Sequence, residues 1–120
     1  MSEIDMTRVL CAEADLRENE TRSFTVGSGD WPLRGFLLRT GGRVHAYVNH
    51  CPHAGHPLNL RPNEFLTADR SLIVCNSHGA LFEKETGYCV AGPCAGQSLQ
   101  RVPIRIEAGL VILAADGEAD

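Results

Sequence analysis

The chain has 120 residues, of which 43% are hydrophobic and 22% are charged. These values are ordinary for one soluble globular domain with a modest buried core. Its 11 basic and 15 acidic residues give a net charge of −4, which argues against a nucleic-acid binder, a class that usually carries a basic face. Residues 1–10 carry charges where a signal peptide would be apolar, and no apolar run is long enough to span a bilayer. We therefore expect a cytoplasmic protein that contacts neither membrane nor nucleic acid.

Short runs of alternating apolar residues, separated by glycines and other turn residues, recur along the chain and predict antiparallel strands. The expected strands cover 8–12, 21–26, 34–39, 43–49, 71–74, 80–82, 88–90, 102–106 and 110–113. The clearest hairpin turns at Gly41-Gly42, because glycine readily adopts the positive φ angles of a tight turn. Alternation in 43–49 places His45 on the solvent side of its strand. Residues 59–70 contain Pro62 and lack helical periodicity, so we expect mostly loop there.

Two Cys-His pairs follow two of these strands. The first is Cys51-Pro52-His53-Ala54-Gly55, and the second is Cys75-Asn76-Ser77-His78-Gly79. Two thiolates and two imidazoles can close a tetrahedral zinc site, or they can hold a two-iron cluster with thiolates on one iron and imidazoles on the other. The single residue between the first pair is short for a structural zinc loop. Each arm supplies one ligand of each kind, and a glycine follows each arm where backbone N–H groups could approach sulfur. The pattern favours the cluster.

The two-part motif, followed by the Gly92-Pro93 loop, resembles the Rieske [2Fe–2S] family. The resemblance implies an all-β fold, a Rieske-type antiparallel sheet sandwich or partial barrel. It also implies a single domain over residues 1–120, with a small cluster-binding subdomain at about 50–95. The implied ligands of the [2Fe–2S] cluster are Cys51 and Cys75 on the inner iron and His53 and His78 on the outer one. With two neutral imidazoles the oxidised cluster has no net charge, so it accepts an electron more readily than an all-cysteine cluster.

Four positions depart from high-potential members of that family, which have an extra cysteine in each loop and hydroxyl groups near the sulfurs. The positions that match the extra cysteines hold His56 and Ser77, and those that match the hydroxyls hold Ala80 and Phe82. The resemblance therefore implies a reduction potential toward the low end of the Rieske range.

Three further features lie outside the ligand set. Cys89 and Cys94 bracket the Gly92-Pro93 loop and could form a disulfide, although free thiols are expected in the cytoplasm. Cys11 is expected to be a small buried strand residue. An apolar docking face around the imidazoles is expected from Pro57, Leu58 and Pro93.

The function implied by the resemblance is one-electron transfer, without chemistry on a substrate in this chain. The carrier would take electrons from a flavin-dependent or other reductase and pass them to an acceptor, a terminal ring-hydroxylating oxygenase. Two alternatives stay open: a small Rieske subunit of a larger oxidoreductase, such as a nitrite-reductase-like complex, and a zinc-stabilised interaction module with no redox role.

Overall fold

The computed structural model describes residues 8–27, 33–52, 57–59, 63–76 and 79–114. Within these ranges the chain forms nine strands and one short 3-10 helix, Glu13–Asp15, so the predicted all-β fold is confirmed. The strands are β1 (Val9–Ala12), β2 (Thr21–Val26), β3 (Leu33–Thr40), β4 (Arg43–Val48), β5 (Ile73–Val74), β6 (Leu81–Phe82), β7 (Cys89–Ala91), β8 (Ile104–Glu107) and β9 (Leu110–Leu113). No helix in the described ranges is long and apolar enough to cross a membrane.

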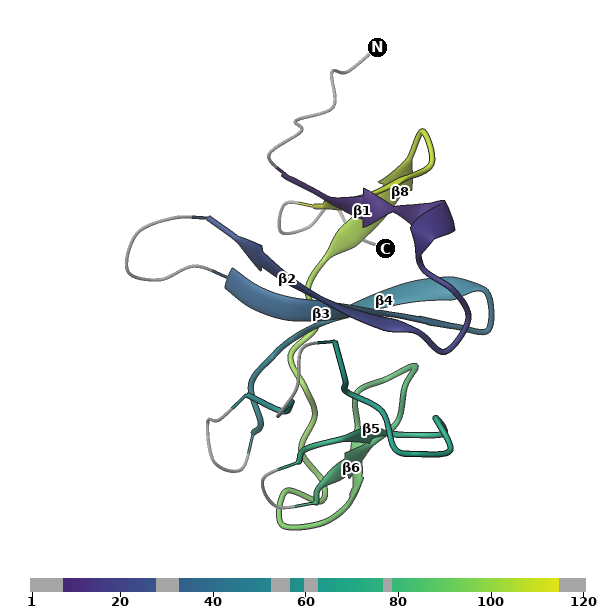
Figure 1. Cartoon of the computed structure of the whole chain (residues 1–120). Helices are drawn as coiled ribbons and strands as arrows, with labels where there is room; N and C mark the ends of the chain where they lie inside the picture. The colour runs from purple at the N-terminus through teal and green to yellow at the C-terminus, as the bar shows by residue number, and fades with distance from the viewer. Residues whose placement is uncertain (1–7, 28–32, 53–56, 60–62, 77–78, 115–120) are drawn as a thin grey trace.

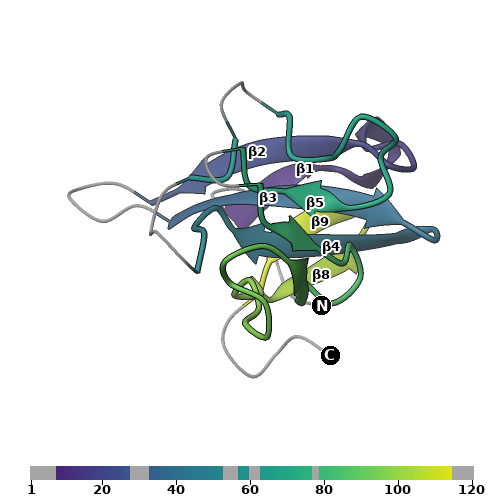
Figure 2. The same cartoon turned by 90° about the horizontal axis from the view of Figure 1, so that it is seen from below.

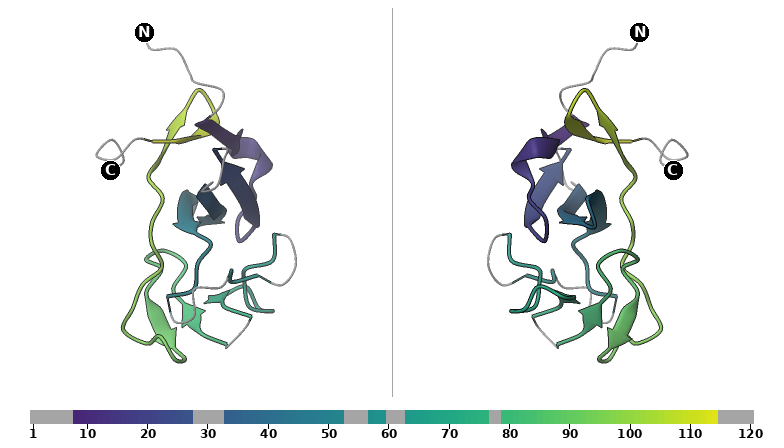
Figure 3. Two further views of the ribbon diagram at one scale, coloured as in Figure 1. Left: turned by 90° about the vertical axis from the view of Figure 1, so that its left-hand side faces the viewer. Right: turned by 90° about the vertical axis from the view of Figure 1, so that its right-hand side faces the viewer.

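The strands form three antiparallel sheets, ordered β1-β9-β8, β2-β3-β4 and β5-β6-β7. The second sheet lies between the other two, as Figures 1 and 3 show from two directions. Seen from below, the third sheet lies across the middle one (Figure 2). The molecule is therefore layered, and its middle sheet is covered on both faces.

The apolar run in β3 follows from this layering. Successive residues of a strand point to opposite faces, and Phe36, Leu37 and Leu38 are all fully buried. Phe36 and Leu38 pack in the core shared with the third sheet, whereas Leu37 packs with Ala46 in the core shared with the first. We call the core between the first and middle sheets the upper core, and the one between the middle and third sheets the lower core. Cys11 on β1 is buried in the upper core, as expected.

The predicted β3–β4 hairpin is confirmed, with φ angles of 62° at Gly41 and 77° at Gly42. The carboxylate of Glu18 accepts hydrogen bonds from both turn amides, at 2.6 and 3.1 Å. Those two backbone bonds lower the pKa of Glu18. This turn is the outer end of the strand pair that leads into the first Cys-His motif.

The segment before β5 is irregular in its described part, residues 63–70, as expected. It is held against β2, because Thr21 Oγ1 donates to the carbonyl of Asn63 at 2.6 Å and the Ser23 amide donates to Asn63 Oδ1 at 2.7 Å. Phe65 then stacks on Phe36, with ring centroids 4.1 Å apart. These contacts fix the lower layer to the middle sheet.

Tyr47 joins the middle and lower layers at their centre. The side chain is fully buried, and its hydroxyl donates to the carbonyl of Lys84 at 2.8 Å. Burial raises the pKa of Tyr47 to about 12. Gly87 lies against the ring, and a Cβ added there would stand 2.8 Å from Tyr47 Cε1. Tyr47 therefore positions the β6–β7 turn under β4.

The expectation that His45 is simply a solvent-side residue is wrong. The side chain is half-buried, and its Nε2 atom has no hydrogen-bond partner among the described residues. Burial, and then the charge of Arg101, lowers the pKa of His45. The cause is the third layer, which covers the face of β4 that alternation alone assigns to solvent.

Candidate metal centre

The two predicted cysteine ligands lie at the ends of paired strands. Cys51 follows β4, Cys75 directly follows β5, and both are fully buried in the lower core. The Cys75 amide donates to the carbonyl of Ala80 at 2.8 Å, and the Gly79 amide donates to the carbonyl of Cys75 at 2.8 Å. Gly79 has a φ of 74°, which glycine adopts readily. The prediction that strands anchor both loops is confirmed.

Hydrogen bonds through Leu58 tie the two loops together. The Leu58 amide donates to Asn49 Oδ1 at 2.7 Å, which fixes the end of the first loop to the end of β4. The Leu58 carbonyl accepts from the Asn76 amide at 2.9 Å and from Asn76 Nδ2 at 3.3 Å. These roles of Asn49 and Asn76 were not predicted from the sequence. Their only sequence signal is a polar amide next to a Cys-His motif.

The donor chemistry of the described half of the site fits a metal centre. Two thiols on neighbouring loops reach the same water-excluded core, where an uncompensated thiolate would be costly and a metal would compensate its charge. His53, His56, Ser77 and His78 lie outside the described residues, so the four-residue ligand set stays a prediction. Within the described ranges, no three His, Cys, Asp or Glu side chains are grouped as a metal site.

Apolar and sulfur-containing side chains surround the two cysteines. Ala80 and Phe82, the positions without hydroxyls, are fully buried in the same core. Cys89 and Cys94 are there too, as free thiols, which agrees with the expectation from the sequence. Burial and contact with Cys89, together with the nearby Cys51, raise the pKa of Cys94 to about 12. The sequence did not predict that Cys94 lies beside Cys51.

The expected apolar docking face is wrong in one of its three members. Pro57 and Pro93 are exposed, but Leu58 is fully buried. Its side chain fills the core behind the loops, and its backbone joins them. Leu58 is therefore a structural residue and presents no surface to a partner.

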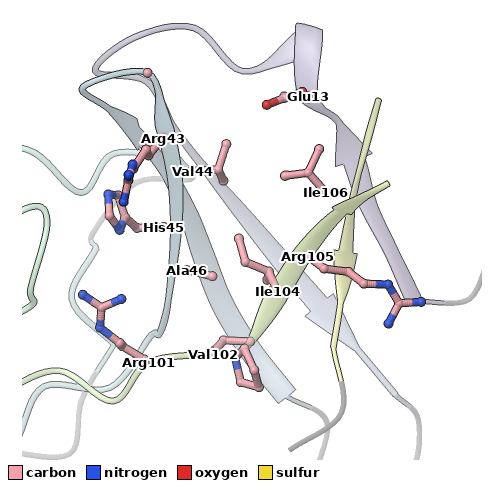
Figure 4. Close-up of a pocket in the computed structure, with 12 residues that line it drawn as sticks. Glu13, Arg43, Val44, His45, Ala46, Arg101, Val102, Ile104, Arg105 and Ile106 are labelled. Carbon is pink, nitrogen blue, oxygen red and sulfur yellow. The ribbon is translucent and has the colours of Figure 1, made fainter. Parts of the chain in front are cut away.

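A cavity of about 560 Å³ lies elsewhere, between β4 and β8. Figure 4 shows Val44, Ala46 and Ile104 facing this gap, with Arg43 and His45 on the other side of β4. The gap separates the edges of two sheets and has an aliphatic inner wall. It offers no donor set comparable to that of the two cysteine loops.

Comparison with known proteins identifies the centre. Residues 6–107 match the family model described as the Rieske [2Fe-2S] domain. The chain belongs to the Rieske [2Fe–2S] domain family. The cofactor of this Rieske domain is accordingly a [2Fe–2S] cluster, and the buried pair Cys51 and Cys75 has the chemistry that the cluster requires. This decides between the two metal centres that the motif left open, against zinc.

Solved structures share the fold of this Rieske domain. The ferredoxin of carbazole 1,9a-dioxygenase from Nocardioides aromaticivorans IC177 is 21% identical, with a TM-score of 0.68, over 90% of this chain and 96% of that one. A chain in a complex of reduced oxygenase and oxidized ferredoxin in carbazole 1,9a-dioxygenase is 24% identical, with a TM-score of 0.66, over 88% of this chain and 99% of that one.

The terminal oxygenase of the Nocardioides dioxygenase also matches, at 23% identity and a TM-score of 0.71, over 94% of this chain but only 31% of the oxygenase. No curated protein gave a significant match. At these identities the structural likeness establishes the fold alone.

Proposed function

We propose that this Rieske domain is a one-electron carrier. It takes electrons from a flavin-dependent or other reductase and delivers them to a terminal ring-hydroxylating oxygenase, without acting on a substrate itself. The observation that carries the proposal is the match over 96% of a dioxygenase ferredoxin, in a chain with the Cys-His motifs of the family. A similar structure described as a complex of reduced oxygenase and oxidized ferredoxin supports the choice of acceptor.

We assign four residues to the cofactor in this function. Cys51 and Cys75 would hold one iron of the cluster, and His53 and His78 would hold the other. When bound, the cluster accepts and releases a single electron. Both cysteines are fully buried, so the side of the cofactor that they would hold is shielded from water.

The loops contribute rigidity to electron transfer. The amide and side chain of Asn76 both donate to Leu58, so the two loops are fixed relative to each other. Ala80 and Phe82 offer the sulfurs no hydroxyl donor, which keeps the potential toward the low end of the Rieske range. A rigid site changes little in shape between its two redox states.

We place the carrier in the cytoplasm, as a single domain over 1–120 with its cluster-binding subdomain at about 50–95. The free thiols of Cys89 and Cys94 suit a reducing compartment. Contact with the reductase and the oxygenase is brief and small, as is usual for electron-transfer partners.

A second candidate is a Rieske subunit or domain that works inside a larger oxidoreductase. The observation in its favour is the match to the oxygenase, in which a domain of this fold makes up 31% of the chain.

Two measurements test the carrier function. The reduced protein, mixed anaerobically with an oxidised terminal oxygenase, should lose its reduced visible spectrum as one electron per cluster passes to the oxygenase. A protein that stays reduced with every ring-hydroxylating oxygenase tried would contradict the choice of acceptor.

Size exclusion of cell extract should show the protein at the size of a free small domain. A stable large complex would favour the subunit alternative.

A further inference from the structure

Two cysteines outside the predicted ligand set lie in direct contact. Cys94 Sγ is 3.0 Å from Cys89 Sγ, and the two side chains are 0% and 1% exposed. Their contact is built by the backbone, because the Gly92 carbonyl accepts from the Ala95 amide at 3.2 Å and the Cys94 carbonyl accepts from the Gln97 amide at 2.9 Å. Gly92, with a φ of 101°, provides the reversal that brings the chain back.

We propose that Cys89 and Cys94 are a redox-active pair, a dithiol that closes to a disulfide at the wall of the cluster pocket. A disulfide has an S–S bond of about 2.04 Å, so the sulfurs must approach by about 1 Å, which small rotations of two side chains can supply. Four residues separate the cysteines. The sulfurs are already placed for intramolecular reaction, which favours disulfide formation within the pair over mixed disulfides with small thiols.

The Cys89–Cys94 pair lies against the second Cys-His loop, so its oxidation would affect the support of the cluster site. The loop lies directly on the end of the second Cys-His loop, because a Cβ added at Gly92 would stand 2.7 Å from Ala80 Cα. Cys89 and Cys94 share one buried core with Cys51 and Cys75. Closing the disulfide therefore replaces two thiols with a covalent link in the layer that supports the cluster ligands.

Oxidised glutathione is a small disulfide that can oxidise the pair by thiol–disulfide exchange. One cysteine thiolate attacks the glutathione disulfide, which breaks that S–S bond and gives a mixed disulfide and one glutathione thiolate. The second cysteine thiolate attacks the mixed disulfide, forms the Cys89–Cys94 bond and releases the second glutathione thiolate. Two electrons pass from the cysteines to glutathione, and the two thiol protons pass to the released thiolates.

Access to the pair requires only a local opening. Both thiols are buried, but the intervening and following residues, Gly92, Pro93, Ala95 and Gly96, are exposed. Four backbone hydrogen bonds of 2.8 to 3.3 Å close the loop, and the longest joins the Gly96 amide to the Cys89 carbonyl at 3.3 Å. Short exposed loops of this kind open at low free-energy cost, so exchange proceeds without global unfolding.

The test uses the cluster-loaded protein, equilibrated anaerobically in buffers from fully reduced to mostly oxidised glutathione, with visible absorbance followed throughout. After acid quenching, alkylation in denaturant and digestion, mass spectrometry quantifies the peptide that links Cys89 to Cys94. We expect this peptide to rise from absent to predominant across the series. The proposal is overturned if both residues stay fully alkylated in every buffer, or if they carry only mixed disulfides with glutathione.

Two variants control the experiment. Cys94→Ala should abolish the linked peptide, and Cys89 should then be found only alkylated or as the mixed disulfide with glutathione, because no second thiol is left to resolve it. Cys11→Ala changes a buried cysteine in the other core, so its linked peptide should follow the wild-type curve. A response to glutathione that is the same in Cys94→Ala as in the wild type would show that other cysteines carry the chemistry, and the pair would be rejected.

Discussion

At the scale of single residues, the side chains packed around Cys51 and Cys75 include no hydroxyl at Ala80 or Phe82. Ala80 and Phe82 are fully buried beside Cys51 and Cys75, and neither can donate a hydrogen bond from its side chain. Hydrogen bonds to sulfur stabilise the more negative, reduced cluster and so raise its potential. A single hydroxyl introduced next to the sulfurs should therefore raise the reduction potential of this domain.

Phe82→Tyr should raise the reduction potential. A hydroxyl that donates to a sulfur and stabilises the reduced state by about 1.4 kcal/mol corresponds to roughly 60 mV for a one-electron couple. An optical redox titration measures the shift. Phe82→Leu is the matched control without a donor, and its potential should change much less. A downward shift in Phe82→Tyr would count against the hydrogen-bond account.

Tyr47→Phe should destabilise the fold by about 0.5–1.5 kcal/mol, because it removes the 2.8 Å hydrogen bond from the tyrosine hydroxyl to the half-buried Lys84 carbonyl. Urea unfolding measures this loss. Tyr88→Phe, at a tyrosine that is 45% exposed, is the control and should change stability little. Equal effects in the two variants would mean that the Tyr47 hydroxyl does not join the layers.

The same tyrosine predicts a dependence on pH. The pKa of Tyr47 is raised from 10 to about 12 by burial, so between these values the unfolded chain loses the proton and the folded one keeps it. Stability from this group is complete below pH 10 and is lost as pH rises toward 12. Tyr47→Phe lacks this group, so its free energy of unfolding should fall less than that of the wild type between pH 10 and pH 12. Urea unfolding of both proteins at each pH measures the two curves.

At the scale of elements, amide side chains hold the two loops that carry Cys51 and Cys75. Asn49 accepts from the Leu58 amide and donates through Nδ2 to Asn59 Oδ1 at 2.9 Å. Asn76 reinforces with its side chain a bond that its backbone already makes to Leu58. The two asparagines should therefore differ in importance.

Asn49→Ala should speed cluster loss more than Asn76→Ala does. The first change leaves the Leu58 amide without its partner, at a cost of about 1–3 kcal/mol. The second removes only the longer 3.3 Å bond and keeps the backbone one. The decay of visible absorbance in excess chelator gives the two rates. The reverse order would show that Leu58 is not held mainly through Asn49.

How far these elements were predictable depends on the range of their interactions. The Gly41-Gly42 hairpin and the strand pattern are local, so alternation and turn residues were enough to predict them. The spacing of the Cys-His pairs was enough to indicate the Rieske family, which the family model over residues 6–107 confirms. The burial of Tyr47 and Leu58 was not, because it is created by a third layer that a period-two pattern cannot represent.

At the scale of the whole molecule, the middle sheet is a base covered by one sheet on each face (Figure 1). The lower layer carries Cys51 and Cys75 and meets the base through Tyr47, Phe36 and Phe65. Packing at this junction holds the Cys51 and Cys75 loops against the base.

Alanine substitutions at two glycines, Gly87 and Gly109, test how closely the middle and lower layers pack. Gly87 and Gly109 both have a φ of 76°, but only Gly87 contacts Tyr47, while a Cβ at Gly109 meets nothing within 4 Å. Alanine at either position costs about 1 kcal/mol or more for the backbone conformation. Gly87→Ala should cost more than Gly109→Ala in urea unfolding, because its Cβ also displaces the Tyr47 ring. Equal costs would mean that the layers are not closely packed there.

The most direct test of the central claim is pulsed EPR of the protein after one-electron reduction. A [2Fe–2S] cluster held by Cys51, Cys75, His53 and His78 predicts a paramagnetic reduced state whose spin couples to two histidine nitrogens. His78→Cys should remove one of these couplings and lower the potential, because it adds a negative ligand. A colourless protein that contains zinc and gives no signal after anaerobic reconstitution, or unchanged couplings in His78→Cys, would contradict the account.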